Sequence, residues 1–174
     1  DQQADDKQVI GNGLPTHFLA WNNTFTYKQL DLNITMRGAF GFQILNTARM
    51  WYEQPVMLTR GNVLTTTYDN IYGKRPLADD QSLNYVSYYV ENGNYWKIDN
   101  ITLGYNMVLK NPFIKRIRVY ASGSNLITFT KYKGIDPEIS ATYGGEDGAL
   151  VPGVDDRNRY PATATYTLGA FFTF

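Results

Sequence analysis

The sequence predicts an all-β protein whose antiparallel, up-and-down strands form the last part of a large transmembrane β-barrel. Three observations lead to this prediction. Five stretches alternate between apolar and polar residues, as a strand with two different faces does. Each stretch has about 12–15 residues, whereas a membrane crossing takes about 9–11 tilted residues and strands of soluble sheets peak near 5–6. The connections are alternately short and long, which is typical of outer-membrane barrels with short periplasmic turns and long extracellular loops.

The composition argues against several other classes. The 174 residues include 16 Lys and Arg against 16 Asp and Glu, so the basic excess of a nucleic-acid-binding protein is missing. The chain has no Cys, which removes disulfides, thiolate metal ligands and Cys nucleophiles. No apolar run approaches the roughly 18–20 residues that a spanning helix needs. The mean hydropathy of −0.37 is compatible with membrane strands, because their apolar residues are interleaved with polar ones.

The first two predicted strands, 16–27 and 29–41, meet at Lys28, which leaves room only for a tight turn. The second has the clearest alternation of all. A long segment, from about residue 42 to 94, then leads to the third strand, 95–109. Within that segment, 84–90 is predicted as an extension of the third strand, interrupted at Asn92-Gly93.

The third strand is cleanly amphipathic only in its second half. Strict alternation puts Trp96 and Ile98 on its polar side, together with Asn100. The short segment 110–115 leads to the fourth strand, 116–130. A second long segment, rich in Gly, Asp and Pro, separates it from the last strand, 163–174.

One face of these strands is expected to contact lipid and the other to line a polar interior. The residues predicted to face the membrane are Leu30, Leu32, Ile34, Met36, Leu103, Tyr105, Ile117 and Val119. The residues predicted to face the lumen, where they could contact a plug or cargo, are Arg118, Tyr120, Ser122 and Ser124. A polar lumen lining needs no cargo to explain it, so the specificity of this second set is low.

Aromatic residues are abundant, with 14 Tyr, 9 Phe and 3 Trp, and many fall near the predicted strand ends. Two aromatic bands are expected where a barrel meets the two water–lipid interfaces. Aromatics are also common in any strand, and the girdle interpretation is favoured about two to one.

Five strands do not close a membrane barrel, which needs about 8 or more. An open sheet edge in hydrocarbon would leave backbone groups without hydrogen bonds. We therefore expect other strands to complete the barrel. The acidic start at Asp1 is expected to follow a removed signal or to lie inside a longer chain.

Several stretches resemble the C-terminal part of SusC/RagA-type TonB-dependent outer-membrane transporters. The strongest is 95–105 (YWKIDNITLGY). The others are 10–15 (IGNGLP), 25–28 (FTYK) with Asp31-Leu32, Gly38 with Gly41, Tyr120, 125–132 (NLITFTKY), 134–138 (GIDPE), Tyr160-Pro161 and 165–174 (TYTLGAFFTF). The likeness spans most of the chain outside 50–83, and it rests on the order of the motifs.

This resemblance implies a barrel of about 22 strands with a plugged lumen. It also implies a SusD-type surface lipoprotein as a lid, energy supplied through TonB, and oligosaccharide or oligopeptide cargo. The plug, a TonB-box region and the earlier strands are not recognised in this sequence. The plug and the TonB contact are therefore expected in a missing N-terminal part.

The last strand ends in a pattern that resembles the signal read by the barrel-assembly machinery. Its residues are Tyr166, Leu168, Ala170, Phe172 and Phe174. Strand addition explains such a signal, because the backbone pairs while alternate side chains give specificity. A lipid-facing strand has the same pattern, and the two interpretations coexist.

The segment 131–138 could be a loop that touches a lid or cargo, through Lys131, Tyr132, Asp136 and Glu138. A structural turn is about twice as well supported, since Gly134 and Pro137 are turn residues.

The loop 144–159 carries Glu146, Asp147, Asp155 and Asp156, which could bind Ca²⁺. The spacing does not match an EF-hand, and solvated loop charge is favoured about five to one.

No catalytic, cofactor or metal site is predicted. The single His, His17, has no nucleophile motif near it. Two other functions compete with an importer segment. One is a soluble carbohydrate-binding β-sandwich or barrel, in which the apolar faces would form a dry core. The other is a passive porin-like or adhesin barrel.

Overall fold

The computed structural model describes residues 8–73, 85–110, 112–139, 152–155 and 160–174. The chain divides into two compact units. We call residues 17–40, 95–130 and 161–174 the sheet unit, and residues 1–16, 41–94 and 131–160 the loop unit. Each is described by itself.

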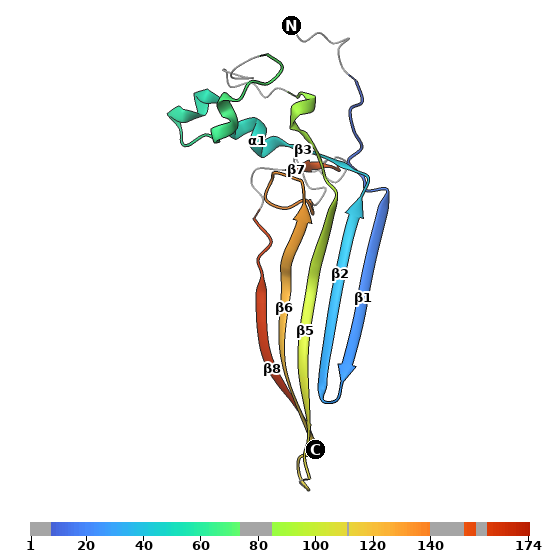
Figure 1. Cartoon of the computed structure of the whole chain (residues 1–174). Helices are drawn as coiled ribbons and strands as arrows, with labels where there is room; N and C mark the ends of the chain where they lie inside the picture. Colours follow the sequence, from blue (N-terminus) through green and yellow to red (C-terminus); the bar gives the residue numbers. More distant parts are fainter. Residues whose placement is uncertain (1–7, 74–84, 111, 140–151, 156–159) are drawn as a thin grey trace. The chain divides into compact units, whose positions relative to one another are not determined.

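The sheet unit is one five-stranded sheet in the order β1-β2-β5-β6-β8, and every neighbouring pair is antiparallel (Figure 1). Its strands are β1 (His17–Tyr27), β2 (Leu30–Phe40), β5 (Tyr95–Val108), β6 (Arg116–Thr130) and β8 (Thr165–Thr173). The bounds differ from the predicted ones by at most two residues at either end. Strands of this sheet that follow one another along the chain are also neighbours in the sheet, as in an up-and-down sheet. Among the described residues, β1 and β8 each have a neighbour on one side only.

Two short connections join the strands at one end of the sheet, which we call the turn end. Between β1 and β2 only Lys28 and Gln29 form the turn, and Lys28 has a φ of +54°. Between β5 and β6, the Leu109 amide donates to the Lys115 carbonyl at 3.0 Å, and the Lys115 amide donates to the Thr173 carbonyl at 2.8 Å.

A β-bulge in β5 overturns the predicted placement of Trp96 and Ile98. Thr35 pairs with Asn100, but Met36 pairs with Ile98, so Asp99 is an extra residue relative to β2. An extra residue reverses the alternation beyond it. Trp96 and Ile98 therefore lie on the apolar face. The ring of Trp96 stacks on Phe40 with centroids 6.2 Å apart.

The loop unit contains a small three-stranded sheet and short helices. Its sheet has the order β4-β3-β7, with β3 antiparallel to β4 and parallel to β7. The elements are β3 (Gln43–Asn46), α1 (Thr47–Tyr52), η2 (Pro55–Thr59), η3 (Thr65–Tyr68), η4 (Ser87–Tyr89), β4 (Val90–Asn92) and β7 (Val154–Asp155). The prediction that 84–90 extends the third strand is wrong for its described part, because η4 and β4 occupy it and β4 pairs with β3.

The core of the loop unit mixes apolar and polar side chains. Ile44, Met50 and Tyr89 are at most 2% exposed. Helix α1 begins where the Asn46 side chain accepts a hydrogen bond from the Arg49 amide at 3.0 Å, as an N-cap does. None of the helices in the described segments is both long and apolar enough to cross a membrane.

Candidate membrane-facing surface and polar face

The apolar residues of the sheet unit are aligned in rows across the strands. Residues directly opposite one another on neighbouring strands share a face. One row contains Phe25, Leu32, Leu103, Ala121 and Leu168. The next row toward the turn end contains Tyr27, Leu30, Tyr105, Val119 and Ala170. The eight residues predicted to face lipid lie together on this apolar face, and so do Tyr166, Leu168, Ala170 and Phe172.

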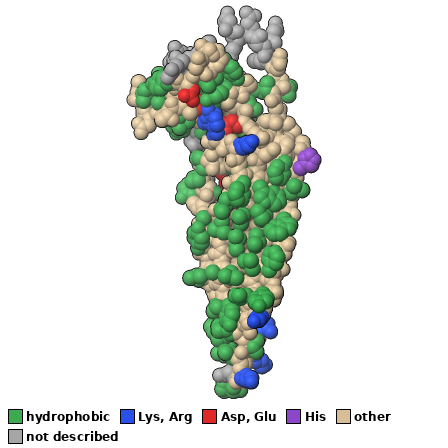
Figure 2. All heavy atoms as spheres, viewed as in Figure 1, with side chains coloured by type: hydrophobic (Ala, Val, Ile, Leu, Met, Phe, Trp, Pro, Cys, Tyr) green, Lys and Arg blue, Asp and Glu red, His purple; other side chains and the backbone are tan. Residues whose placement is uncertain are grey.

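The apolar face is exposed. Leu103 is 49% exposed, Val119 40%, Phe172 54% and Leu168 85%. Figure 2 shows hydrophobic side chains spread over the visible face of the sheet, with Lys and Arg gathered at its turn end. No second layer of the described protein covers these residues, so they form no dry core.

Aromatic rings lie toward both ends of this face. Tyr27 and Tyr105 lie near the turn end, and Phe40, Trp96 and Phe129 lie at the other. Gly38 makes room for Trp96, because a Cβ at Gly38 would lie 2.4 Å from its ring. Tyr166 shares the row of Ile34, in the middle of β2. Rings therefore lie toward both ends of the face, and Trp21, Phe25 and Tyr166 lie in the rows between them.

On the opposite face, an ion pair crosses three strands. Arg118 of β6 donates to Asp31 of β2 through Nε at 3.1 Å and Nη2 at 2.5 Å. Gly104 of β5 lies between them, and a Cβ there would lie within 2.6 Å of both side chains. Asn106 also donates to Asp31 at 2.6 Å. The missing side chain at Gly104 thus allows a two-bond contact, the stronger geometry of an Arg–carboxylate pair.

Hydrogen-bonded amides and hydroxyls continue this polar face away from the turn end. The Asn100 amide donates to Ser122 at 3.1 Å and to Ser124 at 3.0 Å, and Thr102 bonds both Asn100 and Ser122. On the neighbouring strands, Asn33 donates to Asn22 and Thr24. Tyr120 is also on this face and stacks on Phe171, with centroids 5.4 Å apart. The four residues predicted to face the lumen therefore share one polar face.

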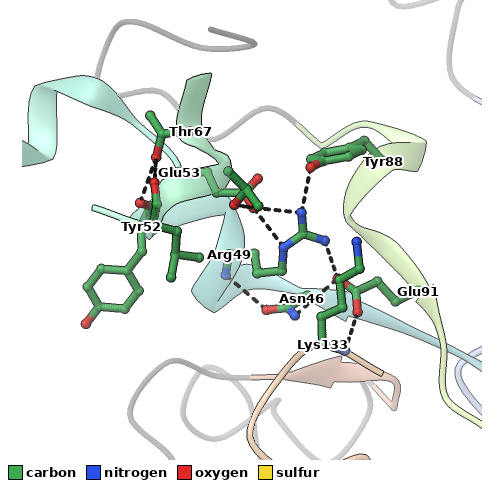
Figure 3. Close-up of polar contacts among 10 residues, drawn as sticks. Asn46, Arg49, Tyr52, Glu53, Thr67, Tyr88, Glu91 and Lys133 are labelled. Atoms are coloured by element: carbon green, nitrogen blue, oxygen red, sulfur yellow. Dashed lines mark hydrogen bonds and ion pairs between the residues drawn. The ribbon is translucent and has the colours of Figure 1, made fainter. Parts of the chain in front are cut away.

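In the loop unit, Arg49 is the centre of a buried ion cluster (Figure 3). Its guanidinium donates to Glu53 at 2.9 and 2.7 Å, to Glu91 at 2.5 Å and to the Tyr88 hydroxyl at 2.7 Å. Burial alone would lower the pKa of Arg49, but the hydrogen bonds and charges of Glu91 and Glu53 outweigh it and raise that pKa. Burial raises the pKa of Tyr88. The cluster ties α1 to η4 and β4.

The segment 131–138 is divided between exposed and buried side chains. Lys131 is exposed. Tyr132 is 6% exposed and its hydroxyl donates to the Asp155 carboxylate. Asp136 is 8% exposed and accepts from the Glu138 amide at 2.9 Å. This geometry favours the structural turn for Tyr132 and Asp136, because buried side chains have no surface to offer a lid or cargo.

Most of the loop 144–159 lies outside the described residues, including Glu146, Asp147 and Asp156. Asp155 is described, is 4% exposed and belongs to the contact with Tyr132. Within the described ranges, no group of three or more His, Asp or Glu is placed to hold a metal ion.

Sequence reasoning missed the ion pair of Asp31 and the whole Arg49 cluster. Asp31 and Arg118 are 87 positions apart, so only the strand register brings them together. The sequence did offer one hint of this contact, because Gly104 on the neighbouring strand has no side chain to separate Asp31 from Arg118.

No family model matches this chain. It is 29% identical over 175 residues to TonB-dependent receptor P3 of Formosa agariphila, and the match covers 97% of this chain and 17% of that protein. It is 35% identical over 181 residues to TonB-dependent receptor SusC of Bacteroides thetaiotaomicron, with 97% of this chain and 16% of that protein covered. The chain thus spans about one sixth of the length of these curated relatives.

Two solved structures share the fold. A structure of the RagAB peptide transporter matches with a TM-score of 0.80 at 21% identity, and one of the RagAB peptide importer in the 'closed-closed' state with 0.77 at 22%. Each match covers all of this chain and 19% of the other.

Proposed function

This chain is related to the SusC/RagA-type TonB-dependent outer-membrane transporters, and we propose that it forms part of the barrel wall of a nutrient importer in a bacterial outer membrane. One observation carries the proposal. The apolar faces of five adjacent strands are aligned and exposed, which is unfavourable in water and expected in hydrocarbon. β1 and β2 have 11 residues, β5 has 14 and β6 has 15, which is enough for a crossing of about 9–11 residues.

The polar face supplies the second half of the proposal. A barrel wall needs a lumen side on which polar groups are satisfied. The Asp31–Arg118 pair and the Asn100 network provide such a side, facing away from the apolar rows. In the complete protein this face lines the lumen and contacts the plug.

The outer edges of β1 and β8 are where the rest of the barrel joins. Strand pairing there satisfies backbone groups that hydrocarbon would leave without partners. In this proposal Tyr166, Leu168, Ala170, Phe172 and Phe174 also serve as the signal for the barrel-assembly machinery.

The coupled partners are those of the related proteins. The relatives are named TonB-dependent receptors, and the solved structures of similar fold are of RagAB peptide importers. We therefore propose energy through TonB, a SusD-type lipoprotein lid and oligosaccharide or oligopeptide cargo, without enzymatic activity. The soluble β-sandwich is not favoured, since the apolar faces form no dry core.

Arginine substitution on the two faces tests the proposal. Ile34→Arg, Val119→Arg and Leu168→Arg should each destabilise the complete protein by about 2–4 kcal/mol near the bilayer midplane. The matched controls are Asn33→Arg and Thr167→Arg, next to two of these positions on the polar face. The measurement is the folded fraction in the outer membrane by heat-modifiable gel mobility and its urea midpoint. Normal assembly of all three apolar-face variants would contradict the membrane assignment.

A further inference from the structure

The turn end of the sheet unit carries a cluster of cations. Lys28 is in the β1–β2 turn, Lys110 and Lys115 are in the β5–β6 connection, and Arg116 begins β6. All four are exposed. The segments 27–30, 105–118 and 166–174 contain no Asp or Glu. Arg118, the other cation at this end, is paired with Asp31.

Backbone contacts hold the cationic segments next to one another. The Asn106 amide donates to the Gln29 carbonyl at 2.8 Å, which fixes the β1–β2 turn beside β5. The Lys115 amide donates to the Thr173 carbonyl at 2.8 Å, which fixes the β5–β6 connection beside the end of β8. The two turns are offset along the strands. Tilted strands of a barrel produce such an offset between hairpins at one rim, so both turns can meet the same layer of headgroups.

Exposed aromatic rings accompany these cations. Tyr27 is 69% exposed, Phe113 78% and Phe174 75%. The Lys28 ammonium lies 5.4 Å from the centre of the Tyr27 ring. Rings at the water–lipid boundary with Lys or Arg reaching past them into the headgroups are the usual arrangement at a membrane interface.

The backbone at Lys28 has a conformation that lysine does not favour. Its φ of +54° lies in the left-handed region, where hairpin turns favour Gly, Asn or Asp. Local backbone preference therefore does not explain a lysine there.

We propose that this cationic turn end, formed by Lys28, Lys110, Lys115 and Arg116, binds anionic phospholipid headgroups in the leaflet that it contacts. The inference rests on the proposed function, because it requires the apolar face to lie in a bilayer. The four cations lie in segments without an Asp or Glu side chain, and the nearby Asp31 is paired with Arg118. Lys and Arg donate charge-assisted hydrogen bonds to phosphate oxygens. At the other end of the sheet unit the cations are arranged differently, because Arg37 is paired with Asp99 at 3.2 Å and Lys97 is 2% exposed.

The test measures which lipid the protein retains. The complete natural protein is mixed in detergent with equal amounts of phosphatidylglycerol and phosphatidylethanolamine, and the bound lipids are counted by native mass spectrometry. The wild type should prefer phosphatidylglycerol, and added salt should weaken the preference. In the double variant Lys110→Gln/Lys115→Gln, the preference for phosphatidylglycerol should fall at least ten-fold, because each cation removed should lower it about five-fold.

The matched control is Lys131→Gln/Lys133→Gln, which removes two exposed cations from the loop unit. It should leave the preference unchanged. An equal loss in both double variants would show only a dependence on net charge and would overturn the proposal. So would an unchanged preference in Lys110→Gln/Lys115→Gln.

The Lys28→Asn variant removes the charge but should preserve the turn, because Asn readily adopts a positive φ. Its preference for phosphatidylglycerol should fall about five-fold, while its thermal unfolding temperature stays equal or rises. A fall in both would point to misfolding of the turn instead and count against the proposal.

The two proposals fail differently. If the protein inserts into bilayers but does not discriminate between the lipids, the headgroup site is refuted and the barrel wall stands. If the wild type does not enter bilayers, the barrel proposal fails and the headgroup site with it.

Discussion

The sheet unit and the loop unit differ in which side chains they expose and which they bury. In the sheet unit, large apolar side chains are on the outside, and Leu168 is 85% exposed. In the loop unit, polar and charged side chains are inside: Asn46 is fully buried, and Arg49 is 6% exposed. Burying a charge is costly unless it is paired and hydrogen-bonded, and exposing apolar surface to water is costly without exception. This difference is what the barrel-wall proposal expects, because it places hydrocarbon against the apolar face of the sheet unit and water around the loop unit.

Removing the buried cation should give the largest effect and confine it to the loop unit. Arg49→Ala leaves Glu53 and Glu91 buried without their partner, which costs about 3–5 kcal/mol in comparable clusters. The amides of β3 and β4 should then exchange hydrogen at least about 100-fold faster, since each 1.4 kcal/mol is a factor of ten. The amides of β2 and β5 should keep their protection.

Arg60→Ala is the control, because Arg60 is an exposed cation of the same unit. A surface change of this kind should stay within about 0.5 kcal/mol. If Arg49→Ala loosens both units equally, the two are not independent in stability and the contrast between them is broken.

The bulge at Asp99 allows an unusual comparison of two deletions in the sheet unit. Deleting Asp99 removes the residue that is extra relative to β2 and keeps Ile98 and Trp96 on the apolar face, so in the pairing with β2 it should cost less than about 1 kcal/mol, mainly from the exposed pair with Arg37. Against β6, which already has one residue more than β5 between these pairs, both deletions shorten β5 equally. Deleting Ile101 instead moves Asn100 into the apolar row of Ile34. An amide facing hydrocarbon should raise the cost to about 2–3 kcal/mol. Urea midpoints of the folded complete protein measure both, and equal costs would argue against the assigned faces.

The smallest expected effect is the coupling across Gly104. A double-mutant cycle with Asp31→Asn and Arg118→Gln should give a coupling of about 1 kcal/mol, since both side chains are partly exposed, at 21% and 26%. Urea midpoints of the four proteins supply the cycle. A coupling near zero would mean that solvent screens this face as fully as an open surface, which a closed and plugged lumen would not do.

The strands of the sheet unit could be predicted because alternation reports directly on two different surroundings. Leu30 to Met36 alternate without a break, and the structure has one strand there. The faces of Trp96 and Ile98 could not be predicted, because a single extra residue leaves no mark in composition. The small sheet of the loop unit was missed for another reason: β3 and β4 have 4 and 3 residues, too few for any period to be recognised.

The candidate surfaces were predictable to different degrees. The apolar face followed from periodicity alone. The polar contacts of Arg118 did not, because they depend on register between strands far apart in the sequence. Tyr132 looked like a loop residue in the sequence, which gave no sign that its side chain is buried or that its hydroxyl donates to Asp155.

The two outer strands of the sheet, β1 and β8, have a consequence for biogenesis. Between export and insertion, this segment would expose hydrogen-bonding edges together with an apolar face, and such edges readily pair with other chains. Aggregation then competes with insertion at every moment of transit. If the sheet is part of a barrel wall as proposed, expression of the segment by itself should therefore yield inclusion bodies.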